Sequence, residues 1–153
     1  MKVSAKADYA VRAAAELAAA QDKGAPVRAE SIATAQGIPQ RFLENILSDL
    51  RHAGLVQSQR GAEGGHRLNR PATEISVADV IRAVDGPLAA VRGERPESVS
   101  YSGPAEPLQR VWIALRKNLR DVVEHVSLAD LASGALPDSV NALADDPEAW
   151  TTR

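Results

Sequence analysis

Four arginines that lie close together in this sequence are its strongest candidates for chemistry, because they could bind DNA phosphates or read a base edge. They are Arg51, Arg60, Arg67 and Arg70. A single acid, Glu63, lies among them, and a glycine-rich run from Gly61 to Gly65 follows Arg60 directly. Glycines permit positive backbone dihedral angles, so this loop could approach DNA while the arginine enters a narrow, electronegative minor groove. For this run alone, a solvated surface hairpin is the alternative.

The segment before this run has the pattern of a helix with one polar face, opened by Pro39 and stopped by Gly54. Apolar residues recur at helical spacing: Phe42, Leu43, Ile46, Leu47 and Leu50. The opposite face carries Arg41, Glu44, Asn45, Ser48 and Asp49. Arg41 could pair with guanine, Asn45 with adenine, and Glu44 with the amino group of cytosine. We therefore expect this helix to read DNA.

Two earlier helices would complete a helix-turn-helix. Ser4 can cap a helix over residues 5–21, and a shorter helix is expected over 28–36, with Gly37 supplying the turn. The alternative for this helical pair is a helix-turn-helix that does not bind DNA. A basic hairpin directly after the pair favours the DNA-binding interpretation.

Short strands on both sides of the glycine-rich loop, over 55–58 and 66–69, would form that hairpin as a wing. A helix capped by Ser76 with Asp79 should then close the core. The predicted fold is mainly α with a small β-hairpin wing (α+β), with a winged helix-turn-helix DNA-binding domain over residues 1–86.

The second half of the chain predicts a loop over 87–107 and then a dimerisation helix with a short capping helix over 108–136. Ser127 with Asp130 should cap the short helix. The apolar stripe of the long helix consists of Leu108, Val111, Trp112, Leu115, Leu119, Val122, Val123 and Val126. A stripe outside the small core needs a partner, so we expect these residues at a dimer interface. Packing against the first helix of the same chain is the alternative. The tail 137–153 is expected to be frayed.

Composition excludes several classes of protein. The sequence contains no cysteine, so disulfides and cysteine-based metal sites are excluded, and its three histidines lack metal-ligand spacing. It has no phosphate-binding P-loop and no nucleophile elbow, so we do not expect an enzyme. No apolar run is long enough to span a membrane, and a cytoplasmic location is expected. The net charge of −2 argues against nucleic-acid binding over the whole surface. Positive charge is instead concentrated between Arg51 and Arg70.

Several motifs together resemble the Rrf-two family of winged helix-turn-helix transcription regulators, which includes IscR, NsrR and CymR. They are Asp-Tyr-Ala at 8–10, Gly-Ile-Pro at 37–39, Leu-Arg-His-Ala-Gly-Leu-Val at 50–56, Arg-Gly-Ala-Glu-Gly-Gly at 60–65 and Ser-Leu-Ala-Asp-Leu at 127–131. The resemblance extends to about Leu136. It implies a homodimer that binds a partly palindromic double-stranded operator, mostly as a repressor.

The resemblance places the family's recognition-helix positions on Pro39, Gln40, Arg41, Phe42, Glu44 and Asn45, and its wing arginine on Arg60. The expected base contacts are Gln40, Arg41, Glu44, Asn45 and Arg60. The expected phosphate contacts, which set the register without reading sequence, are Tyr9, Arg28, Thr34, Gln36, Arg51, Ser58 and Arg67.

The sequence departs from the family in the loop before the long helix. Many members carry there three cysteines that hold an iron–sulfur cluster, but residues 88–107 contain none. Asp8 occupies the position of the family's acidic ligand, and without thiolates it cannot hold a cluster. We expect a member with no cofactor and no metal site. The alternative function is an interaction module that acts through a partner protein or a small-molecule effector, which could bind in a cleft near Tyr101 and Trp112.

Overall fold

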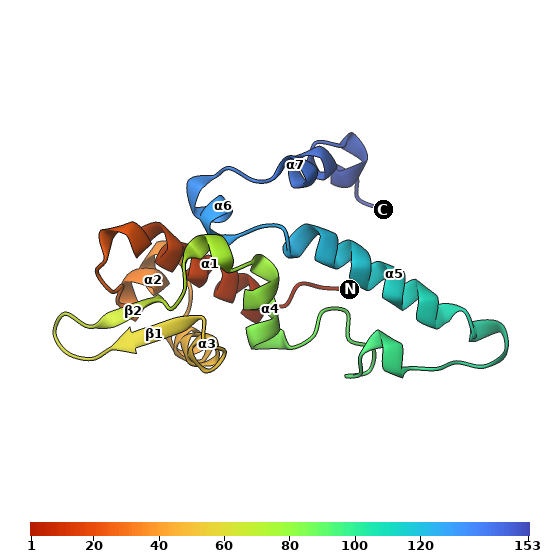
Figure 1. The fold of residues 1–153 in the computed structure, drawn as a ribbon, viewed down its shortest axis with the longest axis horizontal. Coiled ribbons are helices and arrows are strands. Elements are labelled where there is room, and N and C mark those ends of the chain that lie inside the picture. Colours follow the sequence, from red (N-terminus) through yellow and green to blue (C-terminus); the bar gives the residue numbers. More distant parts are fainter.

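The computed structural model describes residues 1–153 and is mainly helical, with one two-stranded antiparallel sheet. Its elements are α1 (Ala5–Ala20), α2 (Ala29–Gln36), α3 (Gln40–His52), β1 (Val56–Gln59), β2 (Gly65–Leu68), α4 (Val77–Asp85), α5 (Leu108–Val123), α6 (Leu128–Ser133) and α7 (Asp138–Ala144). Figure 1 shows α1 to α4 and the hairpin gathered at one side of the molecule, with α5 extending away from them. The predicted fold class is confirmed.

The core forms where α3 packs its apolar side on α1. In α3, Leu43, Ile46, Leu47 and Leu50 are at most 2% exposed. On α1, Ala10, Ala13, Ala14 and Leu17 are buried in the same core cluster. Full burial of a leucine or isoleucine side chain contributes roughly 1.5–3 kcal/mol, so this contact is a large part of the stability of the domain. The predicted cap is also present, since the Ser4 hydroxyl accepts a hydrogen bond from the backbone N–H of Ala7 at 2.9 Å.

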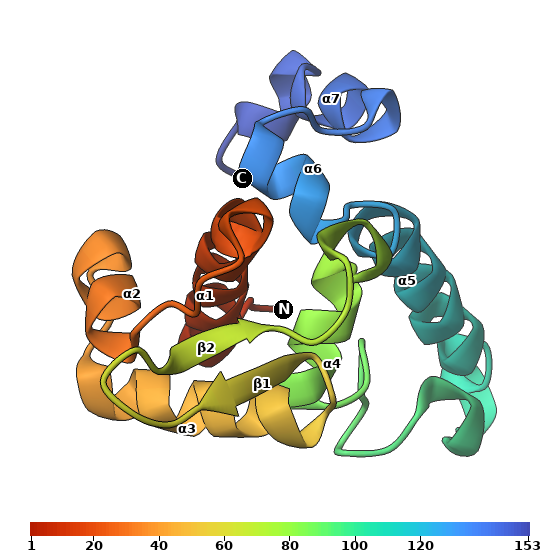
Figure 2. The same ribbon diagram turned by 60° about the vertical axis from the view of Figure 1, so that its left-hand side comes forward.

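The hairpin lies across α1 and α3 (Figure 2). Its strands pair in register from Val56 opposite Leu68 to Gln59 opposite Gly65. The segment before α2 extends this small sheet, because Val27 exchanges two backbone hydrogen bonds with His66, at 2.7 and 2.8 Å. The wing is therefore attached to the rest of the domain by main-chain bonds as well as by the β1–β2 pairing.

Helices α4 and α6 begin with the same capping arrangement. The Ser76 hydroxyl accepts from the Asp79 N–H at 3.0 Å, and the Asp79 carboxylate accepts from the Ser76 N–H at 2.9 Å. Ser127 and Asp130 repeat both bonds at the start of α6. Both capping pairs were predicted from sequence, and both are confirmed.

The two helix starts lie side by side and join the end of the chain to the core. The N–H of Val77 donates to the carbonyl of Val126 at 2.9 Å, and the N–H of Leu128 donates to the carbonyl of Ile75 at 2.8 Å. Leu128 is fully buried within the core cluster. The chain thus leaves the domain through residues 87–107, runs along α5, and returns to the domain at α6.

Helix α5 itself lies outside the core and has no buried residue. It ends at Val123, so Val126 does not lie on this helix as its stripe predicted; the residue lies beyond the helix and is only 6% exposed in a single chain. Its backbone pairing with Val77 draws it into the core of its own domain. The apolar character of Val126 therefore needs no partner subunit.

Residues 87–107 are held against α5 although they form little regular structure. The side-chain amide of Gln109 donates to the carbonyls of Pro96, Glu97 and Val99, the last at 2.8 Å. Arg116 forms an ion pair with Glu97. These bonds, and the burial of Pro96 and Val99, fix the segment to the outer end of the helix.

The tail contains helix α7 and a 3₁₀ turn over Pro147–Trp150, where we expected a frayed segment. Neither element has a buried residue, and Trp150 is 79% exposed. The indole N–H of Trp150 donates to the carbonyl of Ala144 at 2.5 Å, so the tail folds on itself. No helix of the chain combines the length and the apolar character needed to cross a bilayer.

We expect Leu128→Ala to lower the free energy of unfolding by about 2–5 kcal/mol, because it would leave a cavity where α6 enters the core. Leu143→Ala is the matched control, since Leu143 is 60% exposed. Its effect should stay within about 0.5 kcal/mol. Urea denaturation followed by circular dichroism measures both. Equal stability of the two variants would show that α6 does not anchor the chain.

Candidate nucleic-acid interface

The turn between α2 and α3 has the geometry of a helix-turn-helix. Gly37 adopts a left-handed conformation with φ of 62°, which favours glycine. The N–H of Ile38 then donates to the carbonyl of Ala33 at 3.0 Å, and its side chain is 4% exposed. Pro39 is the N-cap of α3, whereas the pattern predicted it as the first helical residue, so the helix begins one residue later, at Gln40. This turn fixes the direction of α3 relative to α2.

The polar face of α3 points away from the core, as its pattern predicted. Gln40, Arg41, Glu44 and Asn45 are all exposed. The guanidinium of Arg41 lies over the ring of Phe42, 5.0 Å from its centroid. The first turns of α3 thus present an amide, a carboxylate and a guanidinium, which are the groups that read base edges in a major groove.

The tip of the wing is a tight turn that begins with the exposed Arg60. A side chain at Gly64 could not fit, because its Cβ would lie 2.2 Å from the carbonyl oxygen of Gln59. Arg28, at the start of α2, donates a hydrogen bond to the carbonyl of Ala62. The backbone of the turn is therefore held in place while the side chain of Arg60 stays free to reach outward.

Two other predicted phosphate contacts also have partners within the chain. Arg67 donates to the side-chain oxygen of Gln59 at 2.8 Å, diagonally across the hairpin. The amide of Gln36 donates to Glu16 at 2.6 Å. These bonds, like that of Arg28, orient the side chains, so contact with a phosphate would use their remaining donors.

A clamp from α1 was missed by the sequence reasoning. Arg12 donates to the carbonyl of Gln36 at 2.5 Å, at the end of α2, and pairs with Asp8 at 2.9 Å. A cation suits this position, because the carbonyls at a helix C-terminus carry partial negative charge. The bonds of Arg12 and Glu16 to Gln36 hold the turn of the helix-turn-helix against α1. Spacing alone shows only that Arg12 and Glu16 share a helix face.

The remaining predicted phosphate contacts lie around this frame. Thr34, Arg51 and Ser58 are exposed on α2, α3 and β1. Tyr9 is half-buried, with the Arg12 guanidinium 4.9 Å from its ring centroid. The structure places these side chains on the elements that surround α3, and their contact with DNA stays a prediction.

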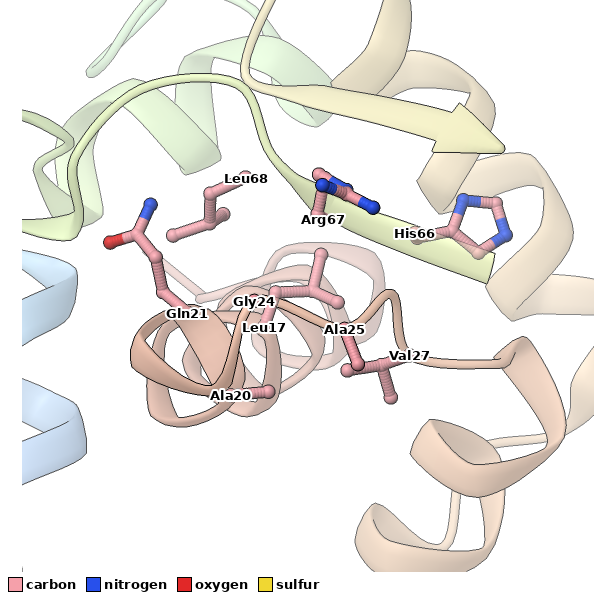
Figure 3. A pocket seen from close by; sticks show the side chains of 9 residues that line it. All are labelled: Leu17, Ala20, Gln21, Gly24, Ala25, Val27, His66, Arg67 and Leu68. Atoms are coloured by element: carbon pink, nitrogen blue, oxygen red, sulfur yellow. The ribbon is translucent and has the colours of Figure 1, made fainter. Parts of the chain in front are cut away.

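A small cavity of about 200 Å³ lies under the base of the wing, between α1 and β2 (Figure 3). His66 lines it, and the buried Nδ1 atom of this histidine has no hydrogen-bond partner. Burial lowers the pKa of His66, and the positive charge of Arg51 lowers it further, while Glu30 opposes the shift. His66 is therefore held in its neutral form at the joint between wing and core.

A much larger groove lies between α5 and the winged domain, and we call it the α5 groove. It encloses about 920 Å³ between residues 1–7, residues 81–92 and the inner side of α5. Trp112, Leu115, Leu119 and Val123 line it from the α5 side. The indole N–H of Trp112 donates to the hydroxyl of Tyr101 at 3.0 Å, and this bond joins the loop segment 87–107 to α5.

The residues predicted at the dimer interface are mostly accessible in the single chain. Leu108, Trp112, Leu115, Leu119, Val122 and Val123 are half-buried, and Val111 is 54% exposed. Ile113, which the stripe did not include, is 38% exposed. Apolar side chains at this exposure on one long helix form an accessible apolar surface, of the kind found at protein–protein interaction sites.

The donor set for a metal is absent from a single chain. The sequence has no cysteine, and no group of three or more His, Asp or Glu side chains could hold a metal ion. The residues present therefore do not fit a thiolate-ligated iron–sulfur cluster.

Comparison with known proteins identifies a family and several relatives that this chain resembles. The Rrf2 family, described as "Iron-dependent Transcriptional regulator", matches residues 3–134. A Mycobacterium tuberculosis protein that carries the name of an HTH-type transcriptional regulator is 54% identical over 146 residues, covering 95% of this chain and 90% of the relative. The HTH-type transcriptional regulator CymR of Bacillus subtilis is 37% identical over 134 residues, covering 87% and 91%.

Solved structures agree with these sequence matches. The structure of CymR, the global cysteine regulator of B. subtilis, superposes with a TM-score of 0.73 at 34% identity and covers 88% of this chain and 98% of that one. IscR of T. potens superposes with a TM-score of 0.69 at 33% identity and covers 100% and 93%.

We expect acid to destabilise the protein through His66. Its pKa is lower in the folded chain than the ordinary value of 6.5, so protonation favours the unfolded chain. The contribution of neutral His66 to the free energy of unfolding is complete above pH 6.5 and is lost as the pH falls through the pKa of His66 in the folded chain. His66→Gln should flatten this loss in urea denaturation between about pH 7.5 and 5, whereas the exposed His125→Gln should not. Parallel curves for wild type and His66→Gln would refute this role.

Proposed function

Since the chain belongs to the Rrf2 family of transcriptional regulators, we propose that it is a homodimeric, sequence-specific DNA-binding repressor that works without an iron–sulfur cluster. Each protomer would lay α3 in a major groove while Arg60 enters the adjacent minor groove. The two protomers would bind the two halves of a partly palindromic operator.

The observation that carries this proposal is the uncovered reading surface. Gln40, Arg41, Glu44 and Asn45 face outward on α3, and Arg60 is exposed at the wing tip. Neither arginine takes part in an ion pair within the chain, although eight ion pairs form elsewhere. Cations without an ion-pair partner in the chain are available to neutralise phosphates or to pair with guanine.

The proposed dimer rests on α5. This helix has no buried residue in a single chain, yet its apolar side chains border a groove of about 920 Å³. A second copy of the chain offers the same exposed stripe and the same groove, so a twofold arrangement could bury both at once. Such a dimer would present two copies of α3 to one operator.

The proposal that no cluster is used rests on donor chemistry. Iron–sulfur clusters are held by thiolates, with histidine as an occasional substitute, and this chain has no cysteine. The segment 87–107 is instead fixed to α5 by the side chains of Gln109 and Arg116. Any signal that changes DNA binding would then reach the protein by another chemistry.

We expect Arg60→Ala to weaken binding to a DNA site selected from a random library and to reduce the slope of log affinity against log salt by about one. Fluorescence anisotropy with labelled duplexes measures both quantities. Arg153→Ala removes the same charge from the far end of the chain and is the control. Equal affinity of wild type and Arg60→Ala would remove Arg60 from the interface.

We expect Leu115→Asp to produce a folded monomer, because it places a charge in the apolar lining of the α5 groove without opening the core. Light scattering coupled to size-exclusion chromatography measures the mass. DNA affinity should fall by roughly 10²-fold or more with the loss of the second half-site contact. Lys117→Asp, at a side chain that is 70% exposed, should stay dimeric. A monomeric wild type would contradict the proposed assembly.

A further inference from the structure

Phe42 is an exposed aromatic residue on the DNA-reading helix, where its neighbours on the surface are polar. It follows the helical spacing of Leu43, Ile46 and Leu50, yet 45% of Phe42 is exposed while each of those three is at most 1% exposed. The core is therefore complete without the outer part of its ring. A single exposed apolar side chain is ordinary on a protein surface, but this one lies directly beside the side chains proposed to read bases.

The ring is also uncovered by the chain on its α1 side. It borders a hollow of about 630 Å³ between α1 and α3, with Tyr9, Asn45 and Ile46 among the other lining residues. The Ile46 side chain is buried and forms an apolar floor, whereas Lys6 and Asp49 pair at the rim at 2.6 Å. An apolar group that enters the groove beside α3 could thus reach the ring without displacing protein atoms.

The ring also supports Arg41. The guanidinium carbon lies 5.0 Å from the ring centroid, within the range of a cation–π contact. A planar guanidinium stacked on an aromatic ring keeps its donors free at the edge while its rotation is restricted. Phe42 is thus placed to orient the group that pairs with a guanine.

A guanidinium that lies over a ring places the two groups at different levels along the DNA axis. An arginine that donates two hydrogen bonds to guanine O6 and N7 lies near the plane of that base. A ring stacked on the guanidinium then lies at the level of an adjacent base pair, since successive pairs are about 3.4 Å apart. At that level the only apolar group exposed in the major groove is the C5 methyl of thymine.

We propose that Arg41 and Phe42 act together to read two adjacent base pairs, with Arg41 binding a guanine and Phe42 contacting the methyl group of a neighbouring thymine. This inference rests on the proposed function, because it requires α3 to lie in a major groove. It adds a specificity-determining residue that neither hydrogen-bond chemistry nor charge would identify.

The test removes only the methyl group. A duplex selected from a random library by the full-length protein is prepared with each thymine replaced in turn by deoxyuridine, which pairs identically with adenine. One replacement beside the guanine read by Arg41 should weaken wild-type binding about fourfold per half-site, the ratio expected for roughly 0.8 kcal/mol from one buried carbon group. Arg41→Ala, which removes every donor, should identify that guanine by losing discrimination there.

Two variants of Phe42 complete the thermodynamic cycle. Phe42→Ser should bind the thymine and deoxyuridine duplexes equally, whereas Phe42→Leu, which keeps an apolar side chain, should retain part of the difference. Urea denaturation and affinity for unrelated DNA verify that both variants fold.

The outcomes separate this inference from the function on which it rests. Wild-type binding that is insensitive to every methyl group, or a Phe42→Ser variant that keeps the full difference, would overturn the inference while DNA binding stands. Failure of the protein to select any DNA sequence would overturn both.

Discussion

The structure depends most on the burial of one side of α3 against α1. Leu43, Ile46, Leu47 and Leu50 are buried in one core cluster with alanines of α1, whose small side chains permit close packing of helices. Because a helix has two sides, fixing the apolar side fixes the direction of the polar one. The same contact that holds the domain together therefore points the side chains proposed to read bases at solvent. Stability and the proposed recognition thus involve opposite faces of the same thirteen residues, Gln40–His52.

The rest of the domain restrains this helix from both ends. Arg12 and Glu16 of α1 hold Gln36, just before the turn into α3. Beyond α3, the hairpin is joined through His66 to Val27, and Arg28 holds the tip of the wing. Ordering a free loop and a free helix on DNA would cost conformational entropy. Here much of that ordering is already present in the chain, which favours a surface that binds DNA with little rearrangement.

Sequence reasoning succeeded where the determinants are local. The helical stripes, the capping pairs at Ser76 and Ser127 and the glycines of the wing all act within a few residues, so their patterns are legible. It could not find the bond from Arg28 to Ala62, because 34 positions separate these residues and no periodicity links them. It assigned Val126 to a partner for a related reason: helical spacing continues past Val123, whereas backbone pairing with Val77 ends the helix and buries the residue. The direction of a side chain and the residue that it contacts depend on the tertiary fold, so local patterns do not show them.

The segment 87–107 shows how the chain orders a loop without metal ligands. A long connection with little regular structure exposes backbone carbonyls that need partners. A single amide, that of Gln109, donates to three of them, and the Arg116 guanidinium pairs with Glu97 beside them. A hydrogen bond from the backbone N–H of Glu97 to its own carboxylate, followed by the Arg116 bond, lowers the pKa of Glu97, so the carboxylate stays charged in mild acid. Both anchors lie on α5, so a displacement of α5 in the proposed dimer would move the loop with it. A signal acting on this region would therefore act on the position of α5, and through α5 on the spacing of the two reading helices.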